Sequence, residues 1–183
     1  MTFDYPGYEL TFIQKRPCKD KSAHQFTLIY KFYSPVTKFF YVLRAEYHSE
    51  DVFAIKFYCK KDKSSDFKYS KIVNRGDTGN ILVTCAKAVP LLLIDYPTAS
   101  FGFGAARSVD KKNNTVEPYV SNQRFGIYRK VAAEKFGSTT FEHIEYEKIS
   151  CYLLINKSHI DVKRKEELVV KMFSENYQTL LDI

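Results

Sequence analysis

The sequence predicts an α+β fold in α/β/α layers: a mixed, mostly antiparallel sheet that starts with an N-terminal meander and carries helices on both faces. Two observations support this class. The first 73 residues are dense in β-branched and aromatic residues that partly alternate with polar ones, which is typical of strands. From Gly79 onward the apolar spacing becomes helical, and strand-like and helix-like segments then follow one another.

Four segments of the first part have strand patterns. Residues 24–33, 38–47 and 52–60 combine aromatic and β-branched residues, and short turn-forming segments separate them. A fourth alternating run covers 67–73. Because short turns join neighbouring strands, we expect these segments to form an antiparallel meander.

The second part starts with a buried helix from Gly79. Pro90 interrupts its apolar run, and since an interior proline costs about 3 kcal/mol, the helix is either kinked there or made of two shorter pieces. The elements expected after it are a glycine-laced strand at 99–106, a basic helix at 121–136 capped by Ser121 and stopped by Gly137, a hairpin of 139–145 and 148–156, and a last helix at 163–182.

The length of the chain indicates how many domains it forms, and its net charge indicates which partners it favours. At 183 residues the chain fits one domain, 1–183, because single cores commonly hold roughly 100–200 residues. It has 28 basic and 21 acidic residues, a formal net charge of +7. This excess favours phosphate-bearing partners such as nucleic acid, a nucleotide or a coenzyme. A well-solvated basic surface accounts for the same charge.

The cysteine pattern and the hydropathy argue against a metal site, a membrane span and a signal peptide. The four cysteines lie far apart without a C-x-x-C pair, so the sequence predicts no zinc or other metal site, and a reduced, cytoplasmic setting is the simplest expectation. The chain has no run of about 18 apolar residues, and its start lacks the basic and apolar regions of a signal peptide. We therefore expect no membrane partner.

The loop Arg75-Gly76-Asp77-Thr78-Gly79-Asn80 is the first candidate site. Backbone N–H groups at the start of a helix bind anions, and glycines allow a close approach. No Lys-Ser or Lys-Thr pair follows, so the loop is not a P-loop. The structural alternative is that Gly76 and Gly79 only turn the chain into the helix.

Tyr128, near the middle of the helix predicted at 121–136, is the second candidate. A tyrosine beside the glycine-laced strand could donate a proton to a leaving group. The alternative is that Tyr128 is a core aromatic in a helical stripe. The acidic hairpin around His143 is a third candidate, although alternation places His143, Glu145 and Glu147 together on a solvated face.

The order of elements from about residue 26 to residue 156 resembles the acyl-CoA N-acyltransferase (GNAT) fold, and also small uncharacterised phage and bacterial proteins that share this topology. The family's loop motif is [Q/R]-x-x-G-x-[G/A]. Arg75 and Gly79 fall near it, with Thr78 where a glycine belongs. Tyr128 matches the family's acid tyrosine, and Asn122 stands six residues before it.

The resemblance implies an enzyme that transfers an acyl group from acetyl-CoA or another acyl-CoA to an amine. Backbone amides around Gly76, Gly79 and Asn80, together with Arg75, would hold the pyrophosphate. Amides of the glycine-laced strand, including those of Phe103 and Ala105, would polarise the thioester carbonyl, and Tyr128 would protonate the departing thiolate. Candidates for a general base are Glu46 and Glu50.

The rival hypothesis is a non-catalytic binding protein that kept this fold and uses its basic and aromatic surface on nucleic acid or another protein. Strands rich in Tyr and Phe and flanked by Lys can stack bases. The thiol, hydroxyl and imidazole side chains show no signature of Ser-His-Asp or Cys-His catalysis.

Overall fold

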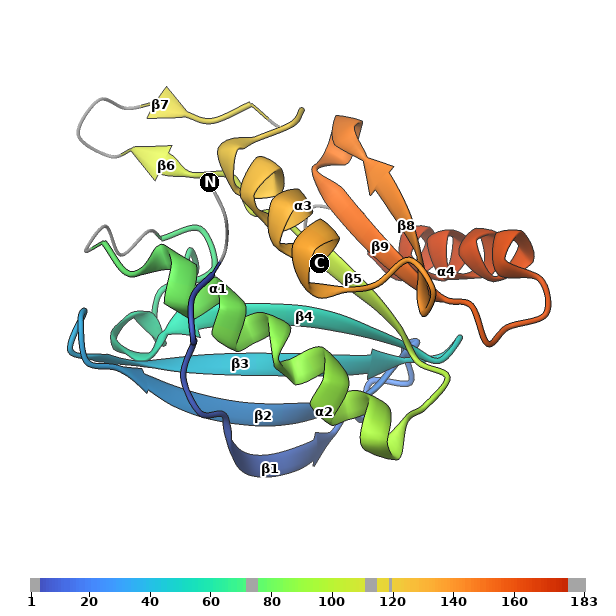
Figure 1. Ribbon diagram of the computed structural model, residues 1–183, viewed down its shortest axis with the longest axis horizontal. Helices are drawn as coiled ribbons and strands as arrows, with labels where there is room; N and C mark the ends of the chain where they lie inside the picture. The colour runs from blue at the N-terminus through green and yellow to red at the C-terminus, as the bar shows by residue number, and fades with distance from the viewer. Residues whose placement is uncertain (1–3, 72–75, 111–114, 119, 178–183) are drawn as a thin grey trace.

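The computed structural model describes residues 4–71, 76–110, 115–118 and 120–177 (Figure 1). They form a seven-stranded sheet of order β1-β2-β3-β4-β5-β9-β8 and a separate two-stranded sheet, β6-β7. Only β4 and β5 pair in parallel within the large sheet, and its other neighbours are antiparallel. The predicted α+β class, with a mixed, mostly antiparallel sheet and an N-terminal meander, is confirmed.

The elements have the following bounds. The strands are β1 (Thr11–Pro17), β2 (His24–Ser34), β3 (Phe39–His48), β4 (Val52–Cys59), β5 (Ser100–Gly104), β6 (Val109–Asp110), β7 (Thr115–Val116), β8 (Phe141–Tyr146) and β9 (Cys151–Asn156). The helices are α1 (Thr78–Ala86), α2 (Ala88–Asp95), α3 (Gln123–Lys135) and α4 (Val162–Asn176), with short 3₁₀ turns at Lys60–Asp62 and Glu147–Ile149.

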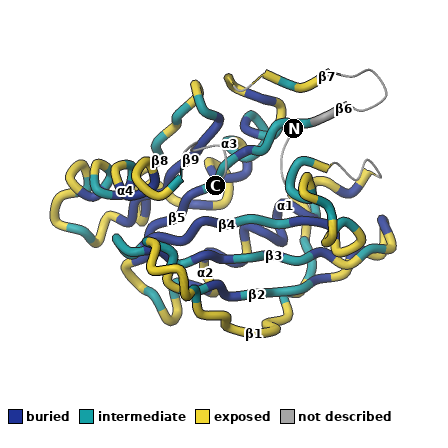
Figure 2. Tube along the Cα trace, turned by 180° about the vertical axis from the view of Figure 1, so that it is seen from behind, coloured by how far each residue is buried: buried dark blue, intermediate teal, exposed yellow. Residues whose placement is uncertain are grey.

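Alternation along β4 divides the core into two parts. Phe53 and Ile55 face α1, α2 and α3 and belong to the main core. Val52 and Ala54 point to the opposite face and pack in a smaller core with α4, which contributes Phe173. The sheet therefore lies between two helical layers, as the sequence predicts, with α4 covering only the part of its face near β4, β5 and β9 (Figures 1 and 2).

The predicted strand at 67–73 is wrong over its described part. Residues 67–70 form successive turns, closed by the bond from the Ser70 amide to the Phe67 carbonyl. Long-range contacts outweigh the local alternation: the Arg124 guanidinium donates to the carbonyls of Tyr69 and Ser70, and the Tyr69 ring packs edge-on against Tyr58. The segment therefore lies beside β4 without extending the sheet.

The helix after Gly79 consists of two pieces, the second of the two expected arrangements. It breaks at Lys87, so Pro90 falls in the first turn of α2, where no intrahelical donor is lost. Together, Thr78–Asp95 is the one stretch of the described chain with the length and composition to cross a membrane. A core helix meets the same criterion, and half of this stretch is buried; the absence of a membrane partner stays a prediction.

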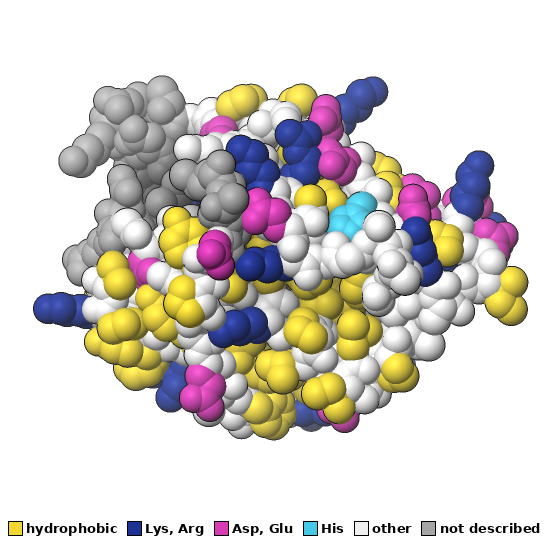
Figure 3. Space-filling view, in the orientation of Figure 1, with side chains coloured by type: hydrophobic (Ala, Val, Ile, Leu, Met, Phe, Trp, Pro, Cys, Tyr) yellow, Lys and Arg dark blue, Asp and Glu magenta, His cyan; other side chains and the backbone are white. Residues whose placement is uncertain are grey.

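The helical side of the molecule carries two kinds of surface (Figure 3). Hydrophobic side chains gather in the lower half of the view, where α2 and β1 lie, and Leu91 and Ile94 of α2 are exposed there. In the upper half, around α3, basic side chains are interspersed with acidic ones. Arg129 of α3, for example, pairs with Glu145 and Glu147.

A buried histidine makes stability depend on pH. His48 is fully buried, bonds through Nδ1 to the Glu46 carbonyl (2.9 Å) and through Nε2 to the Tyr177 hydroxyl (2.6 Å). Burial lowers the pKa of His48 from 6.5 to about 4, although its bond to the Glu46 carbonyl acts the other way. The unfolded chain therefore takes up a proton below about pH 6.5 that the folded chain excludes, so stability falls as pH falls.

We expect the free energy of unfolding to decrease by about 2 kcal/mol between pH 7 and about pH 5 because of His48. Urea denaturation at a series of pH values measures the slope, and a His48→Gln variant should flatten it in this window. An equal slope in the two proteins would show that His48 is not the group responsible.

Candidate functional site

The parallel strands β4 and β5 separate after three residues. Their pairing runs from Val52 with Ser100 to Ala54 with Gly102 and goes no further along the described chain, although β4 continues to Cys59. Figure 1 shows β4 and β5 diverging from this point. Among the described residues, the remaining half of β4 therefore pairs only with β3.

A cavity of about 510 Å³ fills the space between the diverging strands. Its wall combines the open half of β4, the end of β5, one face each of α1 and α3, and the turns that follow β4. The lining residues are Ile55, Lys56, Phe57, Asp66, Phe67, Tyr69, Ser70, Leu82, Cys85, Ala86, Phe103, Gly104, Ala105, Ala106, Arg107, Val116, Tyr128, Val131, Ala132 and Phe136. Its volume is that of an ordinary small-molecule site.

The cavity reaches both faces of the sheet. Phe57 points toward the helices α1 and α3 and belongs to the surroundings of the main core. Lys56 points to the opposite face, where its Nζ lies 2.9 Å from the Glu46 carboxylate. Both residues line the cavity, so the gap between the strands joins the helical side of the sheet to its open side.

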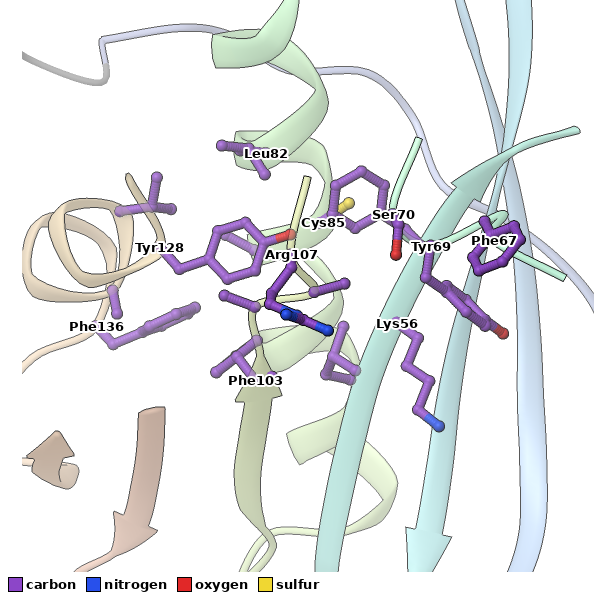
Figure 4. Close-up of a pocket in the computed structure, with 18 of the residues that line it drawn as sticks. Lys56, Phe67, Tyr69, Ser70, Leu82, Cys85, Phe103, Arg107, Tyr128 and Phe136 are labelled. Carbon is purple, nitrogen blue, oxygen red and sulfur yellow. The ribbon is translucent and has the colours of Figure 1, made fainter. Parts of the chain in front are cut away.

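Tyr128 extends from α3 into this cavity (Figure 4). Its hydroxyl points away from the helix toward the opposite wall, and Phe136 lies on the same wall as Tyr128. Among the described residues, no group hydrogen-bonds this hydroxyl. Burial raises the pKa of Tyr128 to about 12, so the phenol stays protonated at neutral pH. Phenol groups in apolar surroundings usually have a partner, and this one is available to a ligand.

Asn122 fixes the start of α3 against the end of β5. Its Oδ1 accepts from the Phe125 amide (2.9 Å), which makes Asn122, not the predicted Ser121, the N-cap. Its Nδ2 donates to the Ala105 carbonyl (2.7 Å). This one buried side chain therefore holds the strand end that contains Ala105 at a set distance from the helix that carries Tyr128.

Of the predicted coenzyme-binding residues, Phe103 and Ala105 line the cavity together with Tyr128. Arg75 lies outside the described residues. Gly76 has a φ of +75°, a conformation that favours glycine, and its surroundings are open. The sequence thus brings three of its candidates to one cavity.

Gly79 and Asn80 lie at the start of α1 and contact the N-terminal segment. The Tyr5 ring covers Gly79 so closely that an added Cβ would lie 2.3 Å from it. Asn80 Oδ1 accepts from the Gly7 amide (3.2 Å). Both residues thus have a structural role in addition to any binding role, which the sequence pattern alone gave no means to detect.

Asp77 anchors the same region. It is buried, and its carboxylate accepts hydrogen bonds from the hydroxyls of Tyr8 and Ser34 and from the side-chain amide of Asn80. Asp77 occupies the N-cap position of α1, but its side chain makes no capping hydrogen bond to the helix. The carboxylate therefore joins the loop to β2 and to the N-terminal segment.

A smaller hollow of about 90 Å³ lies between the cavity and the start of α1. Both spaces are lined by Phe57, Leu82 and Tyr128, and the smaller one extends to Thr78, the first residue of α1. A ligand in the cavity can therefore extend along this hollow toward the helix N-terminus, where anions are stabilised.

Cys85 lines the cavity but was not a sequence candidate, whereas the candidates His143 and Glu46 are engaged in other contacts. Burial raises the pKa of the Cys85 thiol, so this cavity residue is no thiolate nucleophile. His143 bonds to the Tyr152 hydroxyl, away from the cavity lining. Glu46 is paired with Arg44 and Lys56. Among the described residues no cluster of three or more His, Cys, Asp or Glu could hold a metal ion.

Comparison of the chain with protein-family models, with curated proteins and with solved structures finds no match in any of the three.

Proposed function

We propose that this protein is an acyl-CoA-dependent N-acyltransferase of GNAT-like topology. The observation that carries the proposal is the cavity between the diverging strands β4 and β5, with the Tyr128 hydroxyl inside it and no protein partner for that hydroxyl among the described residues. The arrangement suits an extended acyl donor whose leaving group needs a hydrogen bond.

The open edge of β4 supports a ligand that contains amides. From Ile55 to Phe57 the strand is paired with β3 on one side, while its other side borders the cavity. Unpaired backbone groups of a strand edge bind an extended chain by adding it to the sheet. The pantetheine arm of coenzyme A is an extended chain with two amide groups, and thus matches such an edge in a largely apolar cavity.

The charged half of the coenzyme would lie at the ends of the cavity. Arg107 lines it, and the smaller hollow leads to the start of α1 near Gly76 and Thr78. Both offer favourable interactions to a pyrophosphate, one through a cation and the other through the helix dipole. These features support acetyl-CoA or another acyl-CoA as the proposed cofactor.

The reaction would join the amine nitrogen to the acyl carbon and break the bond between that carbon and sulfur, so that an amide and the free thiol of coenzyme A are formed. A phenol with a pKa of about 12 is a weaker acid than a thiol, whose ordinary pKa is about 8.5. Tyr128 would therefore stabilise the departing thiolate by donating a hydrogen bond, and the thiolate would take its proton from solvent. Backbone amides at Phe103 to Ala105 would polarise the carbonyl.

Glu46 is poorly suited to deprotonate the amine. Burial raises the pKa of this carboxyl, but the facing Lys56 and Arg44 outweigh burial and hold its pKa below the usual value. A carboxylate stabilised in this way is a weak base. Glu50 lies in the turn after β3, where its carbonyl accepts from Lys165, and it does not line the cavity. We therefore assign proton removal to solvent.

Calorimetric titration with acetyl-CoA and with coenzyme A tests the proposal. We expect saturable micromolar binding that an Ala106→Phe variant abolishes, because a ring at this cavity position would fill the space between the strands. Ala133→Phe, on the exposed side of α3, is the matched control and should bind as the original chain does. No heat at millimolar coenzyme would contradict the proposal.

A second candidate is a non-catalytic binding protein of the same fold. The observation that favours it is the use of Gly79 and Asn80 by the N-terminal segment, which occupies part of the loop that would hold the pyrophosphate. Absence of coenzyme binding in the titration above would support this candidate over the enzyme.

A further inference from the structure

In the described part of the chain, helices leave most of one face of the meander uncovered. In Figure 2 the strands β2, β3 and β4 lie in front, and no helix crosses them. The helices α1, α2 and α3 pack on the other side, and α4 reaches only the end of this face near Val52 and Ala54. The remainder of the face is a surface formed by alternate side chains of three neighbouring strands.

The strand register places aromatic and basic side chains together on this surface. Tyr33 pairs with Phe40 across β2 and β3. The next rows across the strands are Lys31–Val42–Tyr58 and Ile29–Arg44–Lys56. We call the surface of Lys31, Tyr33, Phe40, Arg44, Lys56 and Tyr58 the basic–aromatic face.

Two of its rings are exposed and adjoin cations. Tyr33 and Phe40 are each 43% exposed, and their ring centroids lie 4.9 Å apart. The Lys31 and Lys60 ammonium groups lie 5.1 Å and 5.9 Å from the Phe40 centroid. An exposed aromatic pair beside lysines offers both a stacking surface and neutralisation of phosphate charge.

The turns after β4 extend this surface. Phe67 is 56% exposed, and the Tyr69 ring lies edge-on to Tyr58 with centroids 5.5 Å apart. The Lys68 ammonium lies 5.4 Å from the Tyr58 centroid and 5.3 Å from that of Tyr69. A strip of cations thus runs from one aromatic group, Tyr33 and Phe40, toward a second one at Phe67.

The charge of this surface is strongly unbalanced. Its rows carry three cations, Lys31, Arg44 and Lys56, and the adjoining turns at 60–71 carry five lysines and two carboxylates, Asp62 and Asp66. On the strand rows the carboxylate in contact with these cations is Glu46, which is buried between Arg44 and Lys56, and in the turns Asp62 pairs with Lys71. Around α3, by contrast, the basic and acidic side chains are mixed (Figure 3).

We propose that the basic–aromatic face binds single-stranded nucleic acid. Cations along a strip fit a sugar–phosphate backbone, and exposed rings at its ends stack on bases, which only unpaired strands can offer. The sheet face lacks the protruding helix or ribbon that enters a duplex groove. Lys56, Phe67 and Tyr69 also line the coenzyme cavity, whereas Lys31, Tyr33, Phe40 and Lys60 do not. The two sites therefore adjoin, but binding through Tyr33 and Phe40 does not depend on whether the protein is an acyltransferase.

Fluorescence anisotropy of the full chain with labelled oligo(dT) and oligo(rU), about 16 nucleotides long, tests the proposal. We expect saturable binding at low salt that weakens as salt is added, and weaker binding of a duplex of equal length. Absence of binding to either oligonucleotide at low salt would overturn the proposal and leave a protein as the partner of this face.

Substitutions on the basic–aromatic face test whether the oligonucleotide binds there. Tyr33→Ala combined with Phe40→Ala should weaken binding about tenfold or more, since each stacked base contributes substantially. Lys31→Ala with Lys60→Ala should reduce the slope of log affinity against log salt by roughly 0.7 for each phosphate that no longer meets a lysine.

Two controls keep the result specific. Phe12→Ala removes a ring that is 53% exposed on β1, and Lys171→Ala removes a cation on α4 whose side chain is 71% exposed. Both should bind as the original chain does, and thermal melting checks that every variant is folded. Equal loss in the controls and in the face variants would contradict the assignment, because binding would then not depend on this face.

Discussion

Replacement of Tyr128 by Phe is expected to lower kcat for acyl transfer about 100-fold, while the dissociation constant of acetyl-CoA changes by less than about threefold. The hydroxyl lines the cavity, and no described residue hydrogen-bonds it, so its removal leaves the protein's own contacts intact. In the proposed reaction, the lost hydroxyl would have donated a hydrogen bond to the sulfur atom as negative charge develops on it. Release of free thiol, followed with a thiol reagent, measures the rate.

The matched control for this change is Tyr47→Phe. Tyr47 also carries a partly buried phenol, which donates to Asp51 (3.0 Å), but it does not line the cavity. It should keep the original rate per folded molecule. Equal rates for Tyr128→Phe and the original protein would remove Tyr128 from the reaction and favour a non-catalytic role for the cavity.

Replacement of Asn122 by Ala is expected to lower the free energy of unfolding by about 3 kcal/mol. Loss of the N-cap bond to the Phe125 amide costs about 1 kcal/mol, and the buried Ala105 carbonyl left without its donor adds roughly 1–3 kcal/mol. Because the same side chain sets the distance between β5 and α3, we also expect weaker coenzyme binding. Urea denaturation and calorimetry measure the two effects.

The Asn122→Ser variant distinguishes the contribution of the N-cap bond from that of the bond to the Ala105 carbonyl. Serine is a good N-cap, but its shorter side chain does not reach the Ala105 carbonyl. Its loss of stability should therefore be smaller than that of Asn122→Ala by about 1 kcal/mol. If the alanine and serine variants lose the same free energy of unfolding, the N-cap bond contributes nothing to stability. If neither variant weakens coenzyme binding, Asn122 does not position the walls of the cavity.

The fold class could be predicted because it depends on local patterns. Aromatic and β-branched alternation predicted the strands β2, β3 and β4, and the change of period at Gly79 predicted α1. The run at 67–73 shows the limit of such patterns. Its alternation is that of a strand, but Arg124, more than 50 positions away along the chain, binds the carbonyls of Tyr69 and Ser70 and leaves the β4 edge open.

The candidate site could be predicted from the sequence only for residues that their own helix or strand places in the cavity. Tyr128 and Phe103 line the cavity because a helical stripe and a short strand place them there. Gly79 shows the opposite case: its lack of a side chain suits a phosphate, but the structure places the Tyr5 ring against it. Lys56 and Arg107 line the cavity because β4 and β5 diverge. No local sequence pattern predicts this divergence.

The most direct test of the proposed coenzyme cleft is an NMR titration of uniformly labelled protein with acetyl-CoA, followed by backbone amide shifts. We expect saturable changes to be largest at 55–57 and at 103–106, the two strand segments that border the cavity. Changes confined to the part of the basic–aromatic face outside the cavity, at 31–33 and 40, or no saturable change at all, would contradict an acyl-CoA site between the diverging strands.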